Sequence, residues 1–97
     1  MDALCLFEES TRRIVAANAS FTQLFELSPV DAVGMDVTRL AWEPEDLARR
    51  LALGATKALH YVARGEFRKQ SGARFSADFS LTPYPQGRLA ALVVAQP

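Results

Sequence analysis

The 97-residue sequence contains one cysteine and one histidine, and both scarcities exclude kinds of site. A single cysteine cannot form an internal disulfide, which fits a reducing compartment. A single histidine cannot supply the several imidazole ligands of a zinc centre. Catalysis by Cys5 would need a nearby base and an exposed thiol, so we predict instead a small buried side chain in the first strand.

No charge of one sign prevails, because eleven Lys and Arg residues balance eleven Asp and Glu residues. Without a net field, the chain is expected neither to hold nucleic acid nor to contact an anionic membrane. No apolar run approaches the roughly 20 residues of a membrane-spanning helix, and no signal-peptide pattern is present. With 49% hydrophobic and 23% charged residues, the sequence predicts a single cytoplasmic α+β domain.

Alternating residues between Ala63 and Pro85 predict two strands joined at a Ser-Gly turn. The polar set is Arg64, Glu66, Arg68, Arg74, Ser76 and Asp78, and the alternate set is Gly65, Phe67, Phe75, Ala77, Phe79 and Leu81. Because neighbouring strand residues point to opposite faces, the second set is expected to face the core.

The segments Ala3–Glu9 and Arg13–Ala17 predict a first hairpin. Arg88–Gln96 is apolar on both faces, which predicts a central strand covered on both sides.

Short helices are predicted between the two hairpins. Asn18 suits the N-cap of a helix whose apolar face includes Phe21 and Phe25. The segment Ser28–Gly34 predicts one helical turn that starts at a proline and stops at Gly34. A further turn is predicted in MDVTRLAWE.

The longest helix is predicted to begin at Pro44. Its apolar stripe consists of Leu47, Leu51, Ala55 and Leu59. Arg49, Arg50 and Lys57 are expected to point to water. The polar side chains expected to face inward are those of Thr38, Thr56 and Tyr61. They carry hydroxyl groups and no charge, so they would bind a charged ligand only weakly.

The order and spacing of four segments resemble the PAS domain family over essentially the whole chain. The segments are RIVAANASFTQLFELS, SPVDAVGMDV, WEPEDLARR and FRKQSGARFSADFSLTPY. Gly34, Pro44, Asp46, Gly72 and Pro83 match positions of the family's motifs. The chain departs from the family pattern at Ser71 in the hairpin turn, at Glu43, and in lacking an Asp-Ile-Thr ending.

The resemblance implies a five-stranded antiparallel sheet with short helices on one face, in the order β-β-α-α-α-β-β-β. Residues 1–97 would then form one PAS domain of a larger signalling protein. Such a module would perceive a signal, mediate dimerisation, or do both, and thereby regulate an attached output domain such as a histidine kinase or diguanylate cyclase. The chain begins almost at the first strand, so the outer apolar face of the sheet is expected to lack a cover and to favour a homodimer.

The resemblance also suggests a cavity between the sheet and the helices. Its lining would be Phe21, Phe25, Trp42, Leu51, Ala55, Phe67, Phe75, Phe79 and Leu81, while Asn18, Gly34 and Gly72 are assigned structural roles. Large aromatic residues there can interlock or leave a hollow, so the cavity is expected to be empty or to hold an apolar or aromatic molecule. Trp42 is expected to serve packing rather than to stack on a planar ligand.

Two cofactors of sensory PAS domains are disfavoured by the residues present. Alternate residues of a strand share a face, so His60 is expected on the same polar face as Arg64, Glu66 and Arg68. This position argues against His60 as a haem ligand. The segment Met35–Leu47 contains no cysteine for a flavin adduct.

The alternative function is a small α+β enzyme that processes a ligand. It would need a charged or nucleophilic group with a perturbed pKa in a pocket, and no catalytic or metal-binding residue is predicted.

Overall fold

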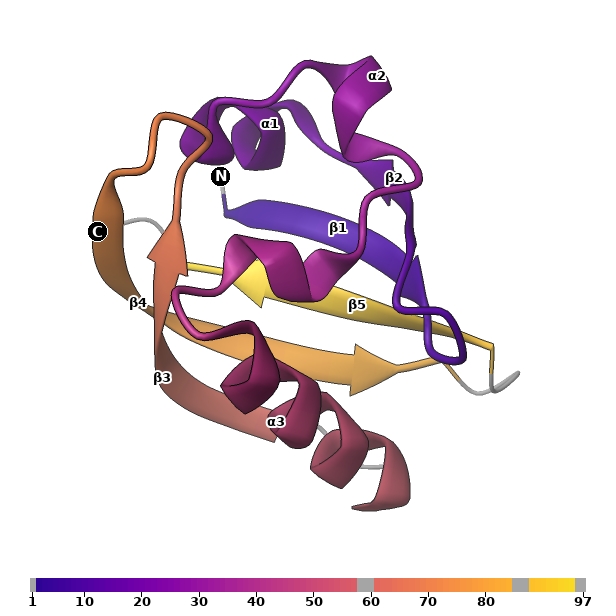
Figure 1. The fold of residues 1–97 in the computed structure, drawn as a ribbon. Helices are drawn as coiled ribbons and strands as arrows, with labels where there is room; N and C mark the ends of the chain where they lie inside the picture. Colours follow the sequence, from indigo (N-terminus) through magenta and orange to yellow (C-terminus); the bar gives the residue numbers. More distant parts are fainter. Residues whose placement is uncertain (1, 58–60, 85–87, 96–97) are drawn as a thin grey trace.

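In a computed structural model, the chain forms a five-stranded antiparallel sheet with helices on one face (Figure 1). The structure describes residues 2–57, 61–84 and 88–95, with the side chains of 54–57 excepted. The strands are β1 (Ala3–Glu8), β2 (Ile14–Ala17), β3 (Tyr61–Arg68), β4 (Arg74–Pro83) and β5 (Leu89–Val94). The helical segments are α1 (Ala19–Phe25), α2 (Pro29–Ala32), the 3₁₀ helix η1 (Val37–Leu40) and α3 (Pro44–Lys57). The predicted fold class and order of elements are confirmed.

The strands are arranged in the order β2-β1-β5-β4-β3. The last strand therefore lies in the centre, between β1 and β4, as its two apolar faces predict. β1 pairs with β5 from Ala3↔Val94 to Glu8↔Leu89. The long hairpin of β3 and β4 pairs from Tyr61↔Leu81 to Arg68↔Arg74, which places β3 at the sheet edge.

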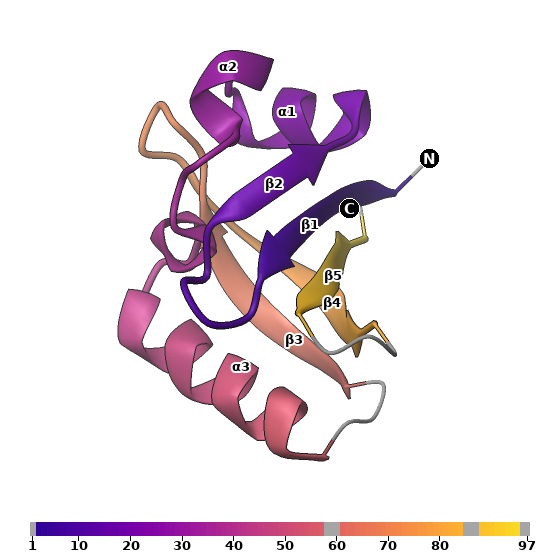
Figure 2. The ribbon, with the colours of Figure 1, turned by 90° about the vertical axis from the view of Figure 1, so that its right-hand side faces the viewer.

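The inner face of the sheet and the helices enclose the hydrophobic core (Figure 2). Alternate strand residues face it, as the hairpin pattern predicts, and their charged neighbours face outward. The largest fully buried side chains are Phe21, Phe25, Phe67, Ile14, Leu92, Val37, Val94 and Cys5. Burial of this apolar surface is the main stabilising contribution to the fold.

Side-chain caps explain where the short helices begin. The Asn18 side chain accepts a hydrogen bond from Phe21 N, and Ser28 accepts one from Asp31 N at the predicted start of α2. Asp36 accepts from Thr38 N at the start of η1. Gly34 follows α2 with φ of +90°, a backbone conformation that glycine adopts without steric cost.

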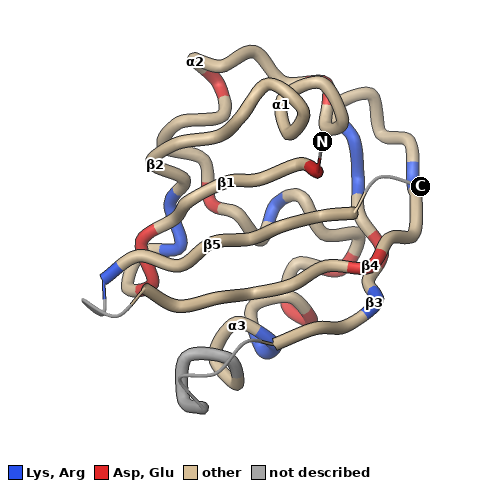
Figure 3. The backbone as a smooth tube through the Cα atoms, turned by 180° about the vertical axis from the view of Figure 1, so that it is seen from behind, with Lys and Arg blue, Asp and Glu red and all other residues tan. Residues whose placement is uncertain are grey.

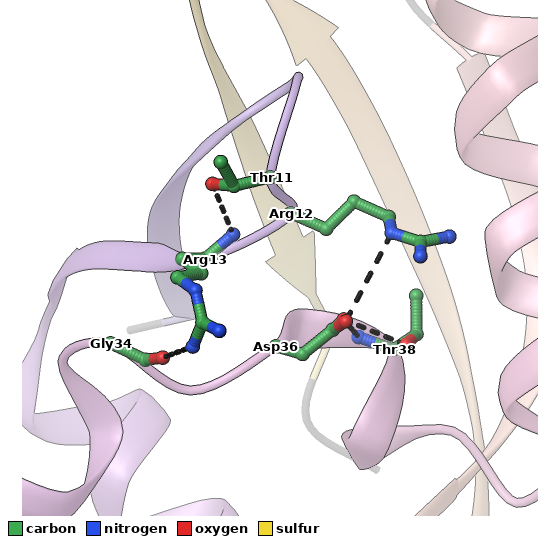
Figure 4. A network of polar contacts seen from close by, with 6 residues as sticks. All are labelled: Thr11, Arg12, Arg13, Gly34, Asp36 and Thr38. Carbon is green, nitrogen blue, oxygen red and sulfur yellow. Dashed lines mark hydrogen bonds and ion pairs between the residues drawn. The ribbon is translucent and has the colours of Figure 1, made fainter.

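A polar network attaches the segment before η1 to the first hairpin (Figure 4). Arg13 donates from Nη1 to the Gly34 carbonyl at 2.7 Å, and Ile14 N donates to the Met35 carbonyl at 2.9 Å. The Arg12 guanidinium lies 4.0 Å from the Asp36 carboxylate. The segment therefore runs beside β2 like a short additional strand, and it fixes the position of η1 over the sheet.

The outer face of the sheet bears no helix in the described part of the chain (Figure 3). Its β1–β5 half is apolar, with Leu4 opposite Val93 and Leu6 opposite Ala91. The prediction that β5 is covered on both sides is wrong for the described chain, because Leu89 and Val93 remain partly exposed. Helices pack against only one of the two faces, so the second face has no cover within these residues.

Candidate functional site

The predicted pocket residues include an aromatic cluster that packs ring against ring. Phe25 lies at its centre, with ring centroids 4.8 Å from Phe21, 5.9 Å from Phe67 and 5.6 Å from Phe75. Phe67 and Phe79 meet edge to face at 5.7 Å. These are ordinary separations for packed aromatic pairs. Phe21, Phe25 and Phe75 therefore interlock with one another, and they line neither of the two clefts described next.

The first cleft lies between α3 and the edge strand β3, and its volume is about 450 Å³. It is lined by Ala41, Trp42, Glu43, Asp46, Leu47, Arg50, Arg64, Gly65, Glu66, Phe67, Ser76 and Phe79. Three predicted pocket residues (Trp42, Phe67 and Phe79) are among them.

Gly65 is what allows Phe79 to form a wall of this cleft. A Cβ atom at this position would lie 2.9 Å from Cε1 of Phe79, which is too close for two carbon atoms. The inward glycine on β3 thus leaves space that the aromatic ring partly fills. Isolated glycines in strands often mark such a close approach.

Arg50 bridges the first cleft, which corrects the prediction that its side chain points to water. Its Nη1 donates to the Arg64 carbonyl at 2.9 Å, and its Nε lies 3.1 Å from the Asp46 carboxylate. The guanidinium carbon lies 5.8 Å from the centroid of the Phe79 ring. The side chain is 26% exposed, whereas that of Arg49 is 71% exposed. Arg50 therefore connects α3 to β3 across this cleft, and its charge is paired with that of Asp46.

The second cleft lies between α3 and the turn of the first hairpin, and its volume is about 270 Å³. Its lining is Phe7, Glu9, Ser10, Arg12, Ala48, Leu51, Ala52, Leu81, Pro83 and Ala90. Leu51 and Leu81 belong to the predicted pocket. Most of these side chains are apolar, and the charged groups of Glu9 and Arg12 come from the turn. Such a cleft suits an apolar molecule with one polar end.

Trp42 packs against arginines rather than against the aromatic cluster. The guanidinium carbons of Arg68 and Arg74 lie 4.5 Å and 4.8 Å from its ring centroid, within the range of cation–π contacts. Its backbone N–H donates to the Glu66 carbonyl at 2.9 Å, which holds it beside the edge of β3. Its neighbours Arg68 and Arg74 form the last pair of β3 and β4 before the turn and are distant from Trp42 in the chain, so neither could be recognised as a partner from the sequence alone.

The predicted structural residues Asn18 and Gly72 lie at corners of the sheet. The Asn18 side chain joins the start of α1 to β1 through hydrogen bonds to Leu4 N and Phe21 N. Gly72 has φ of +94° in the turn between β3 and β4. The side chain of Ala55 and the whole of His60 lie outside the described residues, so the argument about a haem ligand stays a prediction.

Groups that could do chemistry are scarce in the described part of the chain. Cys5 is 1% exposed, and burial raises the pKa of its thiol to about 12, with a small opposing effect of a hydrogen bond to the Leu92 backbone. Thr38 is buried, but its hydroxyl donates to Asp36. No group of three acidic, histidine or cysteine residues that could hold a metal ion is found among residues 2–57, 61–84 and 88–95. In the same ranges, no helix has the length and hydropathy needed to cross a membrane.

Comparison with known proteins identifies the fold. No protein-family model matches the chain, and no curated protein matches its sequence. A PAS domain from a two-component sensor histidine kinase superposes with a TM-score of 0.81 at 18% identity, covering 99% of this chain and 85% of that one. The chain has the PAS fold. The strand order and the single helical layer of this PAS-fold domain are thereby accounted for.

Two other solved structures are similar to the PAS-fold domain over nearly its whole length. A domain of a sensory box sensor histidine kinase/response regulator from Geobacter sulfurreducens gives a TM-score of 0.81 at 12% identity, covering 95% of this chain and 81% of that one. A fungal LOV domain photoreceptor gives 0.81 at 21% identity, covering 99% and 74%. At these identities the likeness concerns the fold and not the ligand.

Proposed function

We propose that this chain is a sensory and dimerisation module, attached to an output domain such as a histidine kinase or diguanylate cyclase. The observation that carries the proposal is the difference between the two faces of the sheet. One face is covered by helices with clefts on both sides of α3, and the other is bare and partly apolar. A signal received beside α3 could reach a partner on the opposite face through the shared strands β4 and β5.

A second copy of the chain suits the outer face for two reasons. The row formed by Leu4, Leu6, Ala91 and Val93 is apolar and lies across two adjacent strands, so two copies can bury it reciprocally. On the neighbouring half of this face, Arg64 pairs with Asp78 and Glu66 pairs with Arg74. Each of these two ion pairs is neutral, so they add little net field that would repel an identical face.

The dimer is tested by a charge placed in the apolar row. We expect the unmodified chain to sediment as a dimer and Leu6→Arg to sediment as a monomer with an unchanged far-ultraviolet circular dichroism spectrum. Val30→Arg is the matched control, because Val30 is 85% exposed on α2, on the opposite side of the sheet. This variant should remain dimeric. A monomeric unmodified chain at high micromolar concentration would contradict the proposal.

For the sensory role, we propose that a ligand, if one is needed, is an apolar or aromatic molecule bound beside α3. Phe79 and Leu81 are neighbours on the inner face of β4, and they line the first and the second cleft respectively. A molecule in either cleft would change how α3 rests on the sheet. Flavin and haem remain disfavoured on the sequence arguments above.

Native mass spectrometry with an absorption spectrum of the same sample tests this part. An added mass per chain would identify a ligand, and the spectrum would reveal flavin or haem. The small enzyme remains the alternative, which the buried Cys5 thiol and the hydrogen-bonded Thr38 do not favour. A bare dimer would favour a module whose signal comes from neighbouring domains, and a flavin or haem band would overturn the arguments against those cofactors.

A further inference from the structure

Three basic side chains converge on a shallow groove where η1 meets the end of β3. The groove has a volume of about 200 Å³ and is lined by Met35, Arg39, Leu40, Arg68, Lys69 and Gln70. Arg39 comes from η1, whereas Arg68 and Lys69 come from the end of the edge strand and the turn after it. The lining includes no carboxylate, so the groove has a local excess of positive charge in a chain with no net charge.

The three cations are not neutralised by ion pairs with the described residues. The arginines that do make such pairs are Arg12, Arg49, Arg50, Arg64 and Arg74. Nearby carboxylates have other partners: Asp36 accepts from Thr38 and faces Arg12, and Glu26 accepts from Ser71 N. Hydrogen bonds from Ser71 are the main cause that lowers the pKa of Glu26, and the charge of Lys69 comes last among the causes.

The walls of the groove are held in place by neighbouring residues. Arg68 stacks on Trp42 with its guanidinium carbon 4.5 Å from the ring centroid, and the Lys69 ammonium lies 5.8 Å from the Phe75 ring centroid. Gln70 N donates to the Phe25 carbonyl at 2.9 Å, which fixes the turn against α1. A site that is arranged before binding loses less conformational entropy when a ligand arrives.

We propose that this groove binds the phosphate group of a small molecule, which bridges η1 and the end of β3. Arginine presents forked N–H donors that match the oxygens of a phosphate, and a doubly charged anion gains more from three cations than a singly charged carboxylate does. The volume suits one such group with a few waters. The groove is separate from the clefts beside α3, so the proposal holds whether or not those clefts take a ligand.

Titration of the chain with inorganic phosphate at constant ionic strength tests the proposal. The readouts are backbone amide chemical shifts and the fluorescence of Trp42, the single tryptophan of the chain, which stacks on Arg68. We expect saturable shifts at Arg39, Lys69 and Gln70 with a dissociation constant in the millimolar range. Arg39→Gln and Lys69→Gln should each weaken binding about fivefold, which is the loss expected for one exposed charge-assisted contact.

Arg88→Gln is the matched control, because it removes an exposed arginine that also lacks an ion pair with the described residues, at the start of β5. It should bind phosphate within twofold of the unmodified chain. Shifts that do not saturate, or an equal loss in Arg88→Gln, would overturn the site. Acetate that binds as tightly as phosphate would overturn the choice of anion. If Arg39→Gln fails to fold, Lys69→Gln decides the same question.

Discussion

Replacing Asn18 with alanine removes hydrogen bonds that join the first strand to the first helix. Its Oδ1 accepts from Phe21 N at 2.9 Å and from Leu4 N at 3.1 Å, and its Nδ2 donates to the Asp2 carbonyl at 3.0 Å. Loss of the cap costs about 1 kcal/mol. Leaving the partly buried Leu4 N–H without its acceptor costs about 1 kcal/mol more. The exposed bond to Asp2 adds little, so the expected loss is about 2 kcal/mol in the free energy of unfolding.

Urea unfolding followed by circular dichroism measures this loss directly. For a domain of this size, a loss of about 2 kcal/mol corresponds to a fall of roughly 8–16 °C in the melting temperature. Asn18→Asp keeps the acceptor oxygen for both N–H groups and should lose less than about 1 kcal/mol.

Ser28→Ala is the control for a simple cap. Ser28 also caps a helix, but its side chain accepts a single bond, from Asp31 N at 3.1 Å, at the exposed start of a four-residue segment. Its replacement should cost about 0.5–1 kcal/mol. If Asn18→Ala cost no more than Ser28→Ala, the reasoning that Asn18 holds the strand as well as the helix would be refuted.

Five further predictions concern the core and the ion pairs. Gly65→Ala should destabilise the fold by about 1–3 kcal/mol, because the new Cβ meets the Phe79 ring at 2.9 Å; an unchanged urea midpoint would show that the ring moves aside easily. Arg50→Ala should lower the hydrogen-exchange protection of α3, since the bond to the β3 backbone is lost. Equal protection in the mutant and the unmodified chain would show that the hydrogen bond from Arg50 to the Arg64 carbonyl does not hold α3 in place. Cys5, with its pKa raised to about 12, should react with a disulfide reagent only after unfolding. Because unfolding returns that thiol to a lower pKa, stability should also fall as the pH rises above about 9. Burial raises the pKa of Asp36, but hydrogen bonds from Thr38 and nearby arginine charge outweigh it, so the net pKa is lowered. Its contribution to stability is therefore present above about pH 4 and is lost as the pH falls through the folded-state pKa. The stability difference between Asp36→Asn and the unmodified chain should accordingly shrink in acid.

Local patterns predicted the elements and their starts because each depends on residues a few positions apart. Asn18 and Ser28 were recognisable as caps since a cap needs only a side-chain oxygen and the N–H groups of the next turn. The alternation around Phe67 and Phe79 similarly predicted which face of the hairpin is buried. The family resemblance then supplied the five-stranded antiparallel sheet with helices on one face, which local patterns do not contain.

The candidate site could be predicted only in part. The described residues of the predicted lining divide among two clefts and a packed aromatic cluster, because the rings of Phe21, Phe25 and Phe75 pack in contact with one another instead of lining one hollow. Arg50 follows Asp46 by one helical turn, a spacing visible in the sequence. Its bond to the Arg64 carbonyl depends on where β3 lies, and no local pattern contains that.

The sequence by itself determined the alternation, the caps and the neutral charge balance, and its single cysteine excludes an internal disulfide, because these follow from residue identity and short spacing. Only the tertiary structure decided that Trp42 stacks on Arg68 and Arg74. It also decided that Arg39 and Lys69 share a groove. These groups are distant in the chain, and they meet because the sheet order and the burial of the common core bring their elements together.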